Sequence, residues 1–303
     1  MLKAPRISVG LPVYNGDNFI SRSIESILAQ DFEDFELIIS DNASLDKTGF
    51  ICQSYAMRDQ RIRYFRNETN IGAALNHNRV FELARGKYFK WAAHDDECLP
   101  RMLSRCFETL EAAPSSVTLV YPHADLINDK GKILGVYSAS IESRDPRPRK
   151  RLAKVLDYTD LGVPMYGLMR TDILRKTRLI DSFVGSDYVL LAELELLGEI
   201  WKIPEVLLLK RLHPARAMEA NKTRKAGRAW HNPLKGNKLD FLGVGDRLIL
   251  EYLRSIFRSE LQVVEKVLSC LMALFLSSIQ RKRLWRWRSR AVRLWGGYRP
   301  APA

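Results

Sequence analysis

The sequence predicts an α/β fold in which a mostly parallel sheet is flanked by helices. Two observations support this prediction: strand and helix patterns alternate four times before residue 95, and each predicted strand ends in polar or turn-forming residues. Alternation of this kind is typical of βαβ units. Because parallel connectivity brings the carboxyl ends of the strands to one edge, we expect a ligand-binding crevice at that edge.

The elements of this first part follow from short apolar runs and from the helical patterns between them. Strands are expected at Ile7–Leu11, Phe35–Ser40, Ile62–Arg66 and Tyr88–Ala93. Helices are expected at Asn18–Ala29, Asp46–Met57 and Asn70–Ala84. The residues that follow the strands are Tyr14 and Asn15, Asp41 and Asn42, Asn67 to Asn70, and Asp95 and Asp96.

The most informative stretch is His94-Asp95-Asp96-Glu97, which directly follows the last of these strands. Adjacent carboxylates repel each other, so a fold that places both at one edge needs a cation or hydrogen-bond donors to stabilise them. Oxygen ligands with few protein contacts suit Mg²⁺ or Mn²⁺ shared with a phosphate. Taken alone, the acidic pair fits equally well a solvated turn before a helix expected at Leu99–Ala113.

Four motifs occur together in the first third of the chain. They are Pro12-Val13-Tyr14-Asn15, Ser40-Asp41-Asn42-Ala43-Ser44, Asn70-Ile71-Gly72 with Asn76, and Asp95-Asp96. In their order and spacing, the block from Ile7 to Pro100 resembles the nucleotide-binding half of family 2 glycosyltransferases. The resemblance implies a Rossmann-like GT-A fold, a nucleotide-diphospho-sugar donor, a Mg²⁺ or Mn²⁺ cofactor, and transfer with inversion at the sugar.

The same resemblance implies a nucleotide site at the strand ends. Pro12 and Tyr14 would line the base pocket, with the tyrosine ring against the base. Asp41 would accept a hydrogen bond from a ring N–H of the base, and Asn70 would lie near the diphosphate.

For the metal, the resemblance implies that Asp95 holds the ribose or supports the ion, and that Asp96 binds the ion. The family often has a further Asp two places before the pair, where this chain has Ala93, so the coordination details stay open. His213 follows the predicted strand Val206–Leu209, where many GT-A enzymes place a metal or phosphate contact. A neutral loop histidine is the alternative.

The second half of the chain would supply the acceptor site. Further elements are expected at Val117–Tyr121, in a hairpin turn at 128–131, at Gly167–Arg170 and at Asp172–Thr177. Asp187 opens an apolar helix that runs to Leu197, and by resemblance it is the general base for the acceptor hydroxyl. The residue before it, a Glu in the family, is Ser186 here. From the sequence alone, a helix cap is the favoured role of Asp187, and only the resemblance reverses this order. Glu193 and Glu195 are expected at solvated or core-edge positions.

Composition fits a soluble enzyme with one catalytic domain and an appendage. We expect a catalytic domain over residues 1–215, with a nucleotide-binding half to residue 125, and a helical, basic region over 216–303. The four cysteines show no paired metal spacing, which favours reduced, inert thiols. No apolar run follows the basic N-terminal residues, so no signal peptide is expected.

The net charge of +13 is concentrated late in the chain. No acidic residue follows Glu265, and Arg281–Arg299 contains eight Arg or Lys. The uncharged run Val267–Ile279 has 13 residues, too few to span a bilayer, which needs about 20. Over Leu284–Trp295, Leu and Trp fall on one half of a helical wheel and most basic residues on the other. This pattern is typical of a helix on an anionic bilayer; docking on the catalytic domain or on a second copy is the alternative.

Together these features predict an inverting, metal-dependent glycosyltransferase at the cytoplasmic face of the cell membrane. Its acceptor would be a lipid-linked saccharide, a glycolipid or an envelope polysaccharide.

Three other classes of protein are alternatives. A non-catalytic relative that only binds nucleotide sugars is one of them, because Ala93 and Ser186 depart from the pattern of the family. A nucleic-acid-binding protein using the Arg and Trp of the tail leaves the strand-end motifs unexplained. A dinucleotide-dependent oxidoreductase is disfavoured because the first turn, Pro12–Gly16, lacks the G-x-G-x-x-G motif.

Overall fold

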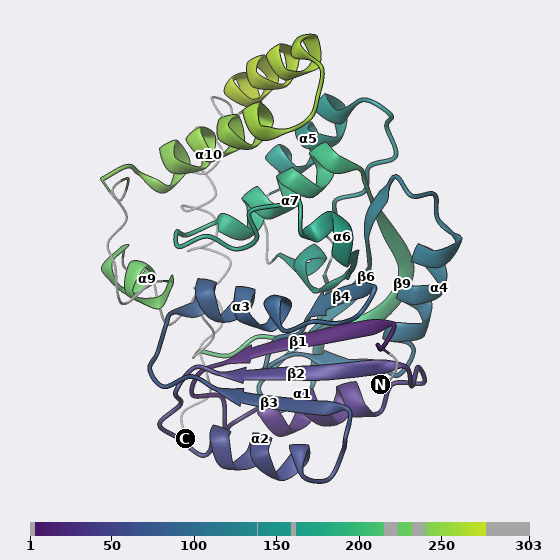
Figure 1. Ribbon diagram of the computed structural model, residues 1–303, viewed down its shortest axis with the longest axis vertical. Helices are drawn as coiled ribbons and strands as arrows, with labels where there is room; N and C mark the ends of the chain where they lie inside the picture. Colours follow the sequence, from purple (N-terminus) through teal and green to yellow (C-terminus); the bar gives the residue numbers. More distant parts are fainter. Residues whose placement is uncertain are drawn as a thin grey trace.

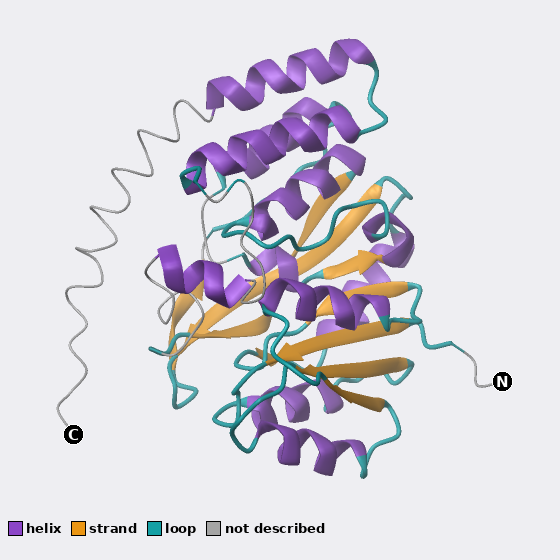
Figure 2. Ribbon diagram, turned by 60° about the vertical axis from the view of Figure 1, so that its left-hand side comes forward, coloured by secondary structure: helices purple, strands orange, loops and turns teal. Residues whose placement is uncertain are grey.

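The computed structural model describes residues 4–137, 139–158, 162–214, 224–231, 239 and 241–276. Within this part, a mixed sheet is covered by helices on both faces, which confirms the α/β class (Figure 1, Figure 2). The predicted helix Leu284–Trp295 and the last residues of the run Val267–Ile279 lie outside the described residues.

One nine-stranded sheet runs through the described residues in the order β3-β2-β1-β4-β8-β6-β9-β5, with β7 paired to β6. The strands are β1 Ile7–Val13, β2 Phe35–Asp41, β3 Ile62–Arg66, β4 Tyr88–Trp91, β5 Glu97–Cys98, β6 Val117–Ile127, β7 Ile133–Tyr137, β8 Leu168–Arg170 and β9 Glu199–Arg211. The first four strands pair in parallel, as predicted. In the second half, β6 and β9 are parallel, whereas β5, β7 and β8 are antiparallel to their neighbours.

The helices form a layer on each face of this sheet. They are α1 Ile20–Leu28, α2 Thr48–Ala56, α3 Ala73–Glu82, α4 Met102–Ala112, α5 Pro148–Asp157, the 3-10 turn η1 Val163–Tyr166, α6 Thr171–Leu174, α7 Ser186–Leu197, α9 Arg224–His231, α10 Val244–Arg258, and a last helix over 263–276. Helices α1, α2 and α4 cover one face, and α3 and α7 the other (Figure 1). No described helix is both long and apolar enough to cross a bilayer.

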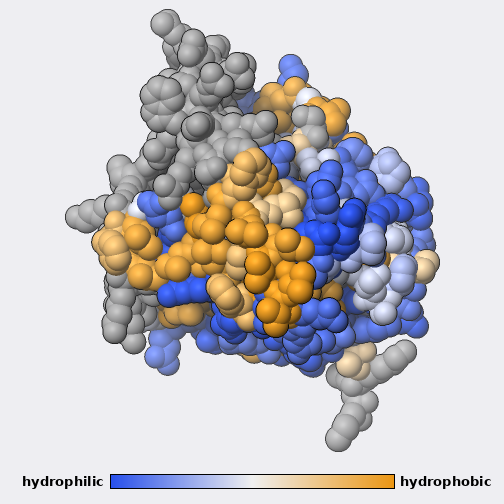
Figure 3. Space-filling view, turned by 90° about the horizontal axis from the view of Figure 1, so that it is seen from above, coloured by the Kyte–Doolittle hydropathy of each residue, from blue (hydrophilic) through white to orange (hydrophobic). Residues whose placement is uncertain are grey.

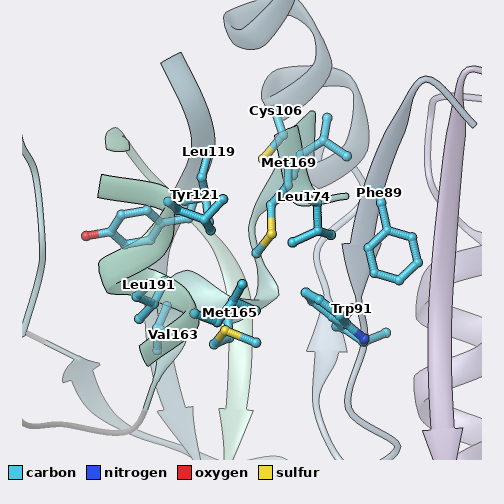
Figure 4. Packing of buried hydrophobic residues seen from close by; sticks show 14 of the residues in the cluster. Phe89, Trp91, Cys106, Leu119, Tyr121, Val163, Met165, Met169, Leu174 and Leu191 are labelled. Carbon is cyan, nitrogen blue, oxygen red and sulfur yellow. The ribbon is translucent and has the colours of Figure 1, made fainter. Parts of the chain in front are cut away.

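The core under α7 follows from the strand register. Phe89 of β4 lies opposite Met169 of β8, which lies opposite Leu119 of β6, so the three side chains share one face of the sheet. Leu191 of α7 packs over the same face, and Trp91 extends the cluster along β4 (Figure 4). Strands buried on both faces read as near-continuous apolar runs, which explains why the first strands are visible in the sequence.

The second half differs from expectation in the length of two strands. Strand β6 continues to Ile127 and β9 begins at Glu199, because the two pair along almost their whole length. Pro122 and Pro204 interrupt the strand pattern in the sequence, since proline cannot donate to a ladder. In the structure, Pro122 lies at a shift of register between β6 and β9, where the missing donor is tolerated.

A buried carboxylate joins the first two strands to the loop after α3. Glu36 of β2 accepts hydrogen bonds from Ser8 Oγ (2.7 Å) and from the Arg85 backbone N–H (2.9 Å). Its second oxygen accepts from Arg63 Nη1 (2.8 Å) and Arg85 Nη2 (2.7 Å). Burial raises the pKa of Glu36, but the bonds from Arg85, Ser8 and Arg63 outweigh it and leave the pKa lowered.

We expect Glu36→Gln to lower the free energy of unfolding by about 1–3 kcal/mol, because a buried acceptor of two guanidinium groups is lost. Urea denaturation at neutral pH measures this. The difference from wild type should shrink as the pH falls through the lowered pKa of Glu36, because protonation removes the same pairs. The control is Glu108→Gln in the exposed pair with Arg105, which should change stability by less than about 1 kcal/mol. Similar losses in both variants would contradict this role of Glu36.

Candidate functional site

The acidic pair faces the carboxyl end of β9. Asp96 accepts hydrogen bonds from Lys210 Nζ (3.0 Å) and from the backbone N–H of Arg211 (2.9 Å). Asp95 Oδ2 lies 2.9 Å from Nε2 of His213, whose ring packs against Phe19 with centroids 4.7 Å apart. The structure thus brings together three residues predicted from distant parts of the sequence.

The two carboxylates differ in their surroundings. The Asp96 side chain is 5% exposed and each of its oxygens has a donor, whereas the Asp95 side chain is 15% exposed. Burial raises the pKa of Asp95, but the hydrogen bond with His213 and the nearby positive charges outweigh it, so the pKa is lowered. Asp95 is therefore an ionised group beside an imidazole, while Asp96 anchors the end of β9.

Lys210 is a functional candidate that the sequence did not reveal. Its ammonium group lies 4.5 Å from the centroid of the Tyr166 ring and is almost completely buried. Burial lowers the pKa of Lys210, but the charges of Asp96 and Asp95 outweigh it and keep the lysine protonated. Its charge also favours ionisation of Asp187. A single fixed cation therefore acts on carboxylates from both halves of the chain.

Tyr166 is positioned by a second buried lysine. Lys90 of β4 donates to the carbonyl oxygens of Tyr166 (2.8 Å) and Trp91 (3.0 Å). Its neighbours in the sequence, Phe89 and Trp91, gave no reason to expect a structural ammonium group within a buried strand. Since unpaired buried charges are costly, the two carbonyl bonds fix η1 against the end of β4.

The nucleotide-binding half forms the other part of the same edge. Val13 of β1 lies opposite Asp41 of β2. The backbone N–H of Asn42 donates a hydrogen bond to the carbonyl oxygen of Val13 (2.8 Å), so the pairing extends one residue beyond β2. Pro12 is buried within β1, whereas the Tyr14 side chain is 40% exposed and presents its ring to solvent.

Asp41 is fully buried and its carboxylate holds the loop that follows β2. One oxygen accepts from the backbone N–H of Ser44 (2.8 Å). The other accepts from Tyr64 Oη (2.9 Å) and from Arg66 Nη1 (2.5 Å). Arg66 is half exposed, whereas the Asp41 side chain is completely buried.

A network of amide side chains shapes the loop before α3. Asn67 Nδ2 donates to Asn42 Oδ1 (2.8 Å) and to Asn76 Oδ1 (3.1 Å). Asn42 Nδ2 donates to Asn70 Oδ1 (2.8 Å), which also accepts from the backbone N–H of Gly72 (2.9 Å). Asn70 is thus held at the opening of α3, the position expected of a residue near a diphosphate.

Asp187 lies in the first turn of α7, two residues after Gly185. The N-cap position belongs to Gly185, whose φ of 91° is left-handed, and Asp187 follows in the first turn, where its carboxylate accepts from backbone N–H groups of the helix start. A contact that stabilises the helix start and a role as base are both compatible with this position. Gly162 approaches it from the preceding loop: a Cβ there would lie 3.3 Å from Asp187 Oδ2. Burial raises the pKa of Asp187, although backbone N–H groups at the start of the helix and Lys210 partly oppose this.

The expectation for the two glutamates further along α7 is wrong. Glu193 and Glu195 are buried and paired rather than solvated. Glu193 accepts from Arg178 Nε (2.6 Å), and Glu195 accepts from Ser143 Oγ (2.5 Å). These pairs join α7 to neighbouring segments and take no part in the crevice.

Residues 8–177, more than half of the chain, match the model of glycosyl transferase family 2. The chain belongs to this family. It is 28% identical over 218 residues to an uncharacterized glycosyltransferase of Rickettsia typhi, covering 70% of this chain and 66% of that protein. The chain therefore spans slightly less than two thirds of that relative.

Two solved structures share the fold. TarS of S. aureus, solved with UDP, superposes with a TM-score of 0.62 at 16% identity, covering 89% of this chain and 70% of that one. A mannosyltransferase of Pyrobaculum calidifontis, solved with GDP-Man and Mn²⁺, superposes with a TM-score of 0.52 at 14% identity, covering 94% and 88%. These neighbours confirm the predicted GT-A fold.

The two aspartates should respond differently to loss of charge. Asp96→Asn leaves the buried Lys210 without its partner and should lower the free energy of unfolding by about 3 kcal/mol. Asp95→Asn keeps an acceptor for His213 and should cost less than about 1 kcal/mol. Chemical denaturation of both variants measures the difference, and equal losses would show that Asp96 is not the structural anchor.

Proposed function

We propose that the protein is an inverting, metal-dependent glycosyltransferase that moves a sugar from a nucleotide-diphospho-sugar to a hydroxyl acceptor. The observation that carries the proposal is the cluster at the carboxyl end of β9, where Lys210 pairs with Asp96 and His213 lies 2.9 Å from Asp95. Asp187, at the start of α7, is the candidate base in the acceptor half, and the charge of Lys210 favours its ionisation. Membership of the family and neighbours solved with UDP and GDP-Man support the same chemistry.

Asp95 and His213 are the residues that fit a divalent cation best. No group of three or more His, Cys, Asp or Glu side chains within the described ranges is arranged to hold a metal. Asp95 and His213 nevertheless offer a carboxylate oxygen and an imidazole nitrogen 2.9 Å apart. Mg²⁺ and Mn²⁺ often use one or two protein ligands and complete their shell with phosphate oxygens and water. We therefore favour Asp95 over Asp96 as the carboxylate ligand, since the oxygens of Asp96 already have donors.

In the proposed reaction, Asp95 and His213 would act on the donor diphosphate, and Asp187 would act on the acceptor hydroxyl. A divalent ion held by Asp95 and His213 would offset charge on the departing diphosphate as a Lewis acid. Asp187 would accept the proton of the acceptor hydroxyl as its oxygen bonds to the anomeric carbon and the bond to the diphosphate breaks. Direct displacement with one base and no enzyme nucleophile inverts the anomeric centre.

In the donor half, Tyr14 would stack on the base and Asp41 would accept a hydrogen bond from its ring N–H. The exposure of Tyr14 supports the stacking role, and the hydrogen bond from the half-exposed Arg66 to Asp41 is the one that a base N–H would replace. Asn70 would lie by the diphosphate at the opening of α3.

We further propose that the acceptor is a lipid-linked saccharide, a glycolipid or an envelope polysaccharide, and that the enzyme lies on the cytoplasmic face of the membrane. The composition of the last part of the chain supports this location, because Arg281–Arg299 combines eight basic residues with tryptophans and no acidic residue. Such segments bind anionic lipid surfaces.

A donor screen tests the proposed activity. Release of nucleoside diphosphate from UDP- and GDP-sugars, with and without Mn²⁺, would identify a substrate without knowledge of the acceptor. Metal-dependent turnover is expected. Nucleotide binding without turnover, with glycolipid acceptors present, would favour a non-catalytic relative.

Loss of the imidazole should uncouple nucleotide binding from the metal. We expect His213→Ala to weaken the Mn²⁺-dependent part of UDP or GDP affinity at least about tenfold, measured by titration calorimetry with and without Mn²⁺. His123→Ala, on the middle of β6, is the control and should behave as wild type. Unchanged Mn²⁺ dependence in His213→Ala would remove His213 from the metal site.

Asp187→Asn should lower turnover about 10²–10⁴-fold while donor affinity and stability stay close to wild type. Because burial raises the pKa of Asp187, activity should rise with pH through a value above the usual carboxyl range, since the ionised form is the base. This rise of activity at the acidic side of the pH profile (the acid limb) should be absent from the residual activity of Asp187→Asn. Asp172→Asn, an exposed carboxyl in the first turn of α6, is the matched control. An unshifted acid limb in Asp187→Asn would assign the base to another residue.

A further inference from the structure

The helix over 263–276 forms a hairpin with α10 at one end of the molecule (Figure 1). Its inner side packs against the rest of the protein. Ser269 and Ala273 are fully buried, and Glu265 forms an ion pair with Arg149 of α5. Lys266 Nζ donates to the carbonyl oxygen of Phe257 near the end of α10 (3.0 Å). The orientation of the helix is therefore set by these contacts, and its opposite side faces outward.

That outward side carries only apolar side chains. We call it the outer stripe, and its members are Val263, Val264, Val267, Leu268, Leu271 and Leu274. Each is between 38% and 76% exposed, and their spacing of three or four residues places them along one side of the helix. Viewed from this end, apolar residues gather into a continuous patch (Figure 3). Contiguous exposed apolar surface of this kind marks an interaction site rather than ordinary protein surface.

We propose that the outer stripe lies on an anionic phospholipid bilayer, with its aliphatic side chains inserted below the head groups. The positive charge of the last part of the sequence favours an anionic bilayer over other partners. No acidic residue follows Glu265, and eight Arg or Lys lie between 281 and 299, a few residues beyond the stripe in the sequence. An anionic bilayer offers an apolar interior and a negative surface together, which matches both features. A second copy of the chain would meet the apolar stripe with another apolar stripe but would repel the basic residues. The inference adds a second membrane contact to the proposed location and rests on that part of the proposed function.

The same hairpin packs directly behind the proposed base. Arg178 donates to Glu193 of α7 (2.6 Å) and to Glu251 of α10 (2.6 Å), so one guanidinium joins the two helices. Leu248 of α10 lies against Gly185, where an added Cβ would be 3.1 Å away. These contacts hold the hairpin, and with it the outer stripe, in a fixed relation to α7.

Vesicle binding of full-length variants tests the stripe. We expect wild type to sediment with phosphatidylcholine vesicles that contain phosphatidylglycerol, and to retain part of this binding at high salt, because screening weakens only the charge contribution. The double variant Val267→Glu, Leu271→Glu should lose the salt-resistant part, about tenfold or more in partition coefficient. Met57→Glu introduces one such charge at an 80% exposed apolar position at the end of α2, and should bind as wild type does. All variants should bind nucleotide normally, since none of the substituted residues belongs to the crevice.

Three results would overturn the inference in distinguishable ways. If the stripe variant keeps its salt-resistant binding while Trp285→Ala with Trp287→Ala loses it, the tail alone contacts the membrane and the proposed location stands. If wild type binds no vesicles while donor turnover is normal, both membrane contacts fail and the catalytic assignment stands. If the stripe variant converts a dimer to a monomer in sedimentation velocity without changing vesicle binding, a second copy covers the stripe.

Discussion

The site depends on one buried cation. The ammonium group of Lys210 lies between Asp96 and the ring of Tyr166, at the point where β9 leaves the sheet. Without it, two adjacent and largely buried aspartates would lack a nearby ammonium group, and their repulsion would favour protonation of one of them. With it, the Asp96 carboxylate has a cationic partner, although burial still leaves the pKa of Asp96 raised, and Asp95 stays ionised beside His213. Lys210 thus occupies a donor position on Asp96, whereas Asp95 is kept ionised chiefly by its hydrogen bond with His213.

Much of this site could be predicted because parallel connectivity is a strong constraint. Tyr14, Asp41, Asn70 and the acidic pair each follow a recognisable strand, so their meeting at one edge needs no knowledge of side-chain packing. Lys210 could not be predicted in the same way. It lies on a strand that the sequence shows only in part, because Pro204 interrupts the pattern, and its partner is more than a hundred residues away. Its burial depends on the long pairing of β6 with β9.

The acceptor half shows a related limit of sequence patterns. Charged residues on a helix read as solvated, yet Glu193 and Glu251 are buried around Arg178. Burying charge is costly unless partners are well placed, and these partners come from separate segments that only the folded chain brings together. Such buried ion pairs add little net stability compared with apolar packing. However, any other packing of the helices would leave the buried charges without partners. They therefore fix how the C-terminal hairpin sits on α7.

The amide network beside the acidic pair has a different consequence. The hydrogen bonds that link Asn42, Asn67, Asn70 and Asn76 involve no group that gains or loses a proton. The loop that opens α3 therefore keeps its shape over the pH range in which Asp187 changes charge. If Asp187 is the base as proposed, acidity would slow the transfer step and leave the shape of this loop, and with it the proposed diphosphate contact, unchanged.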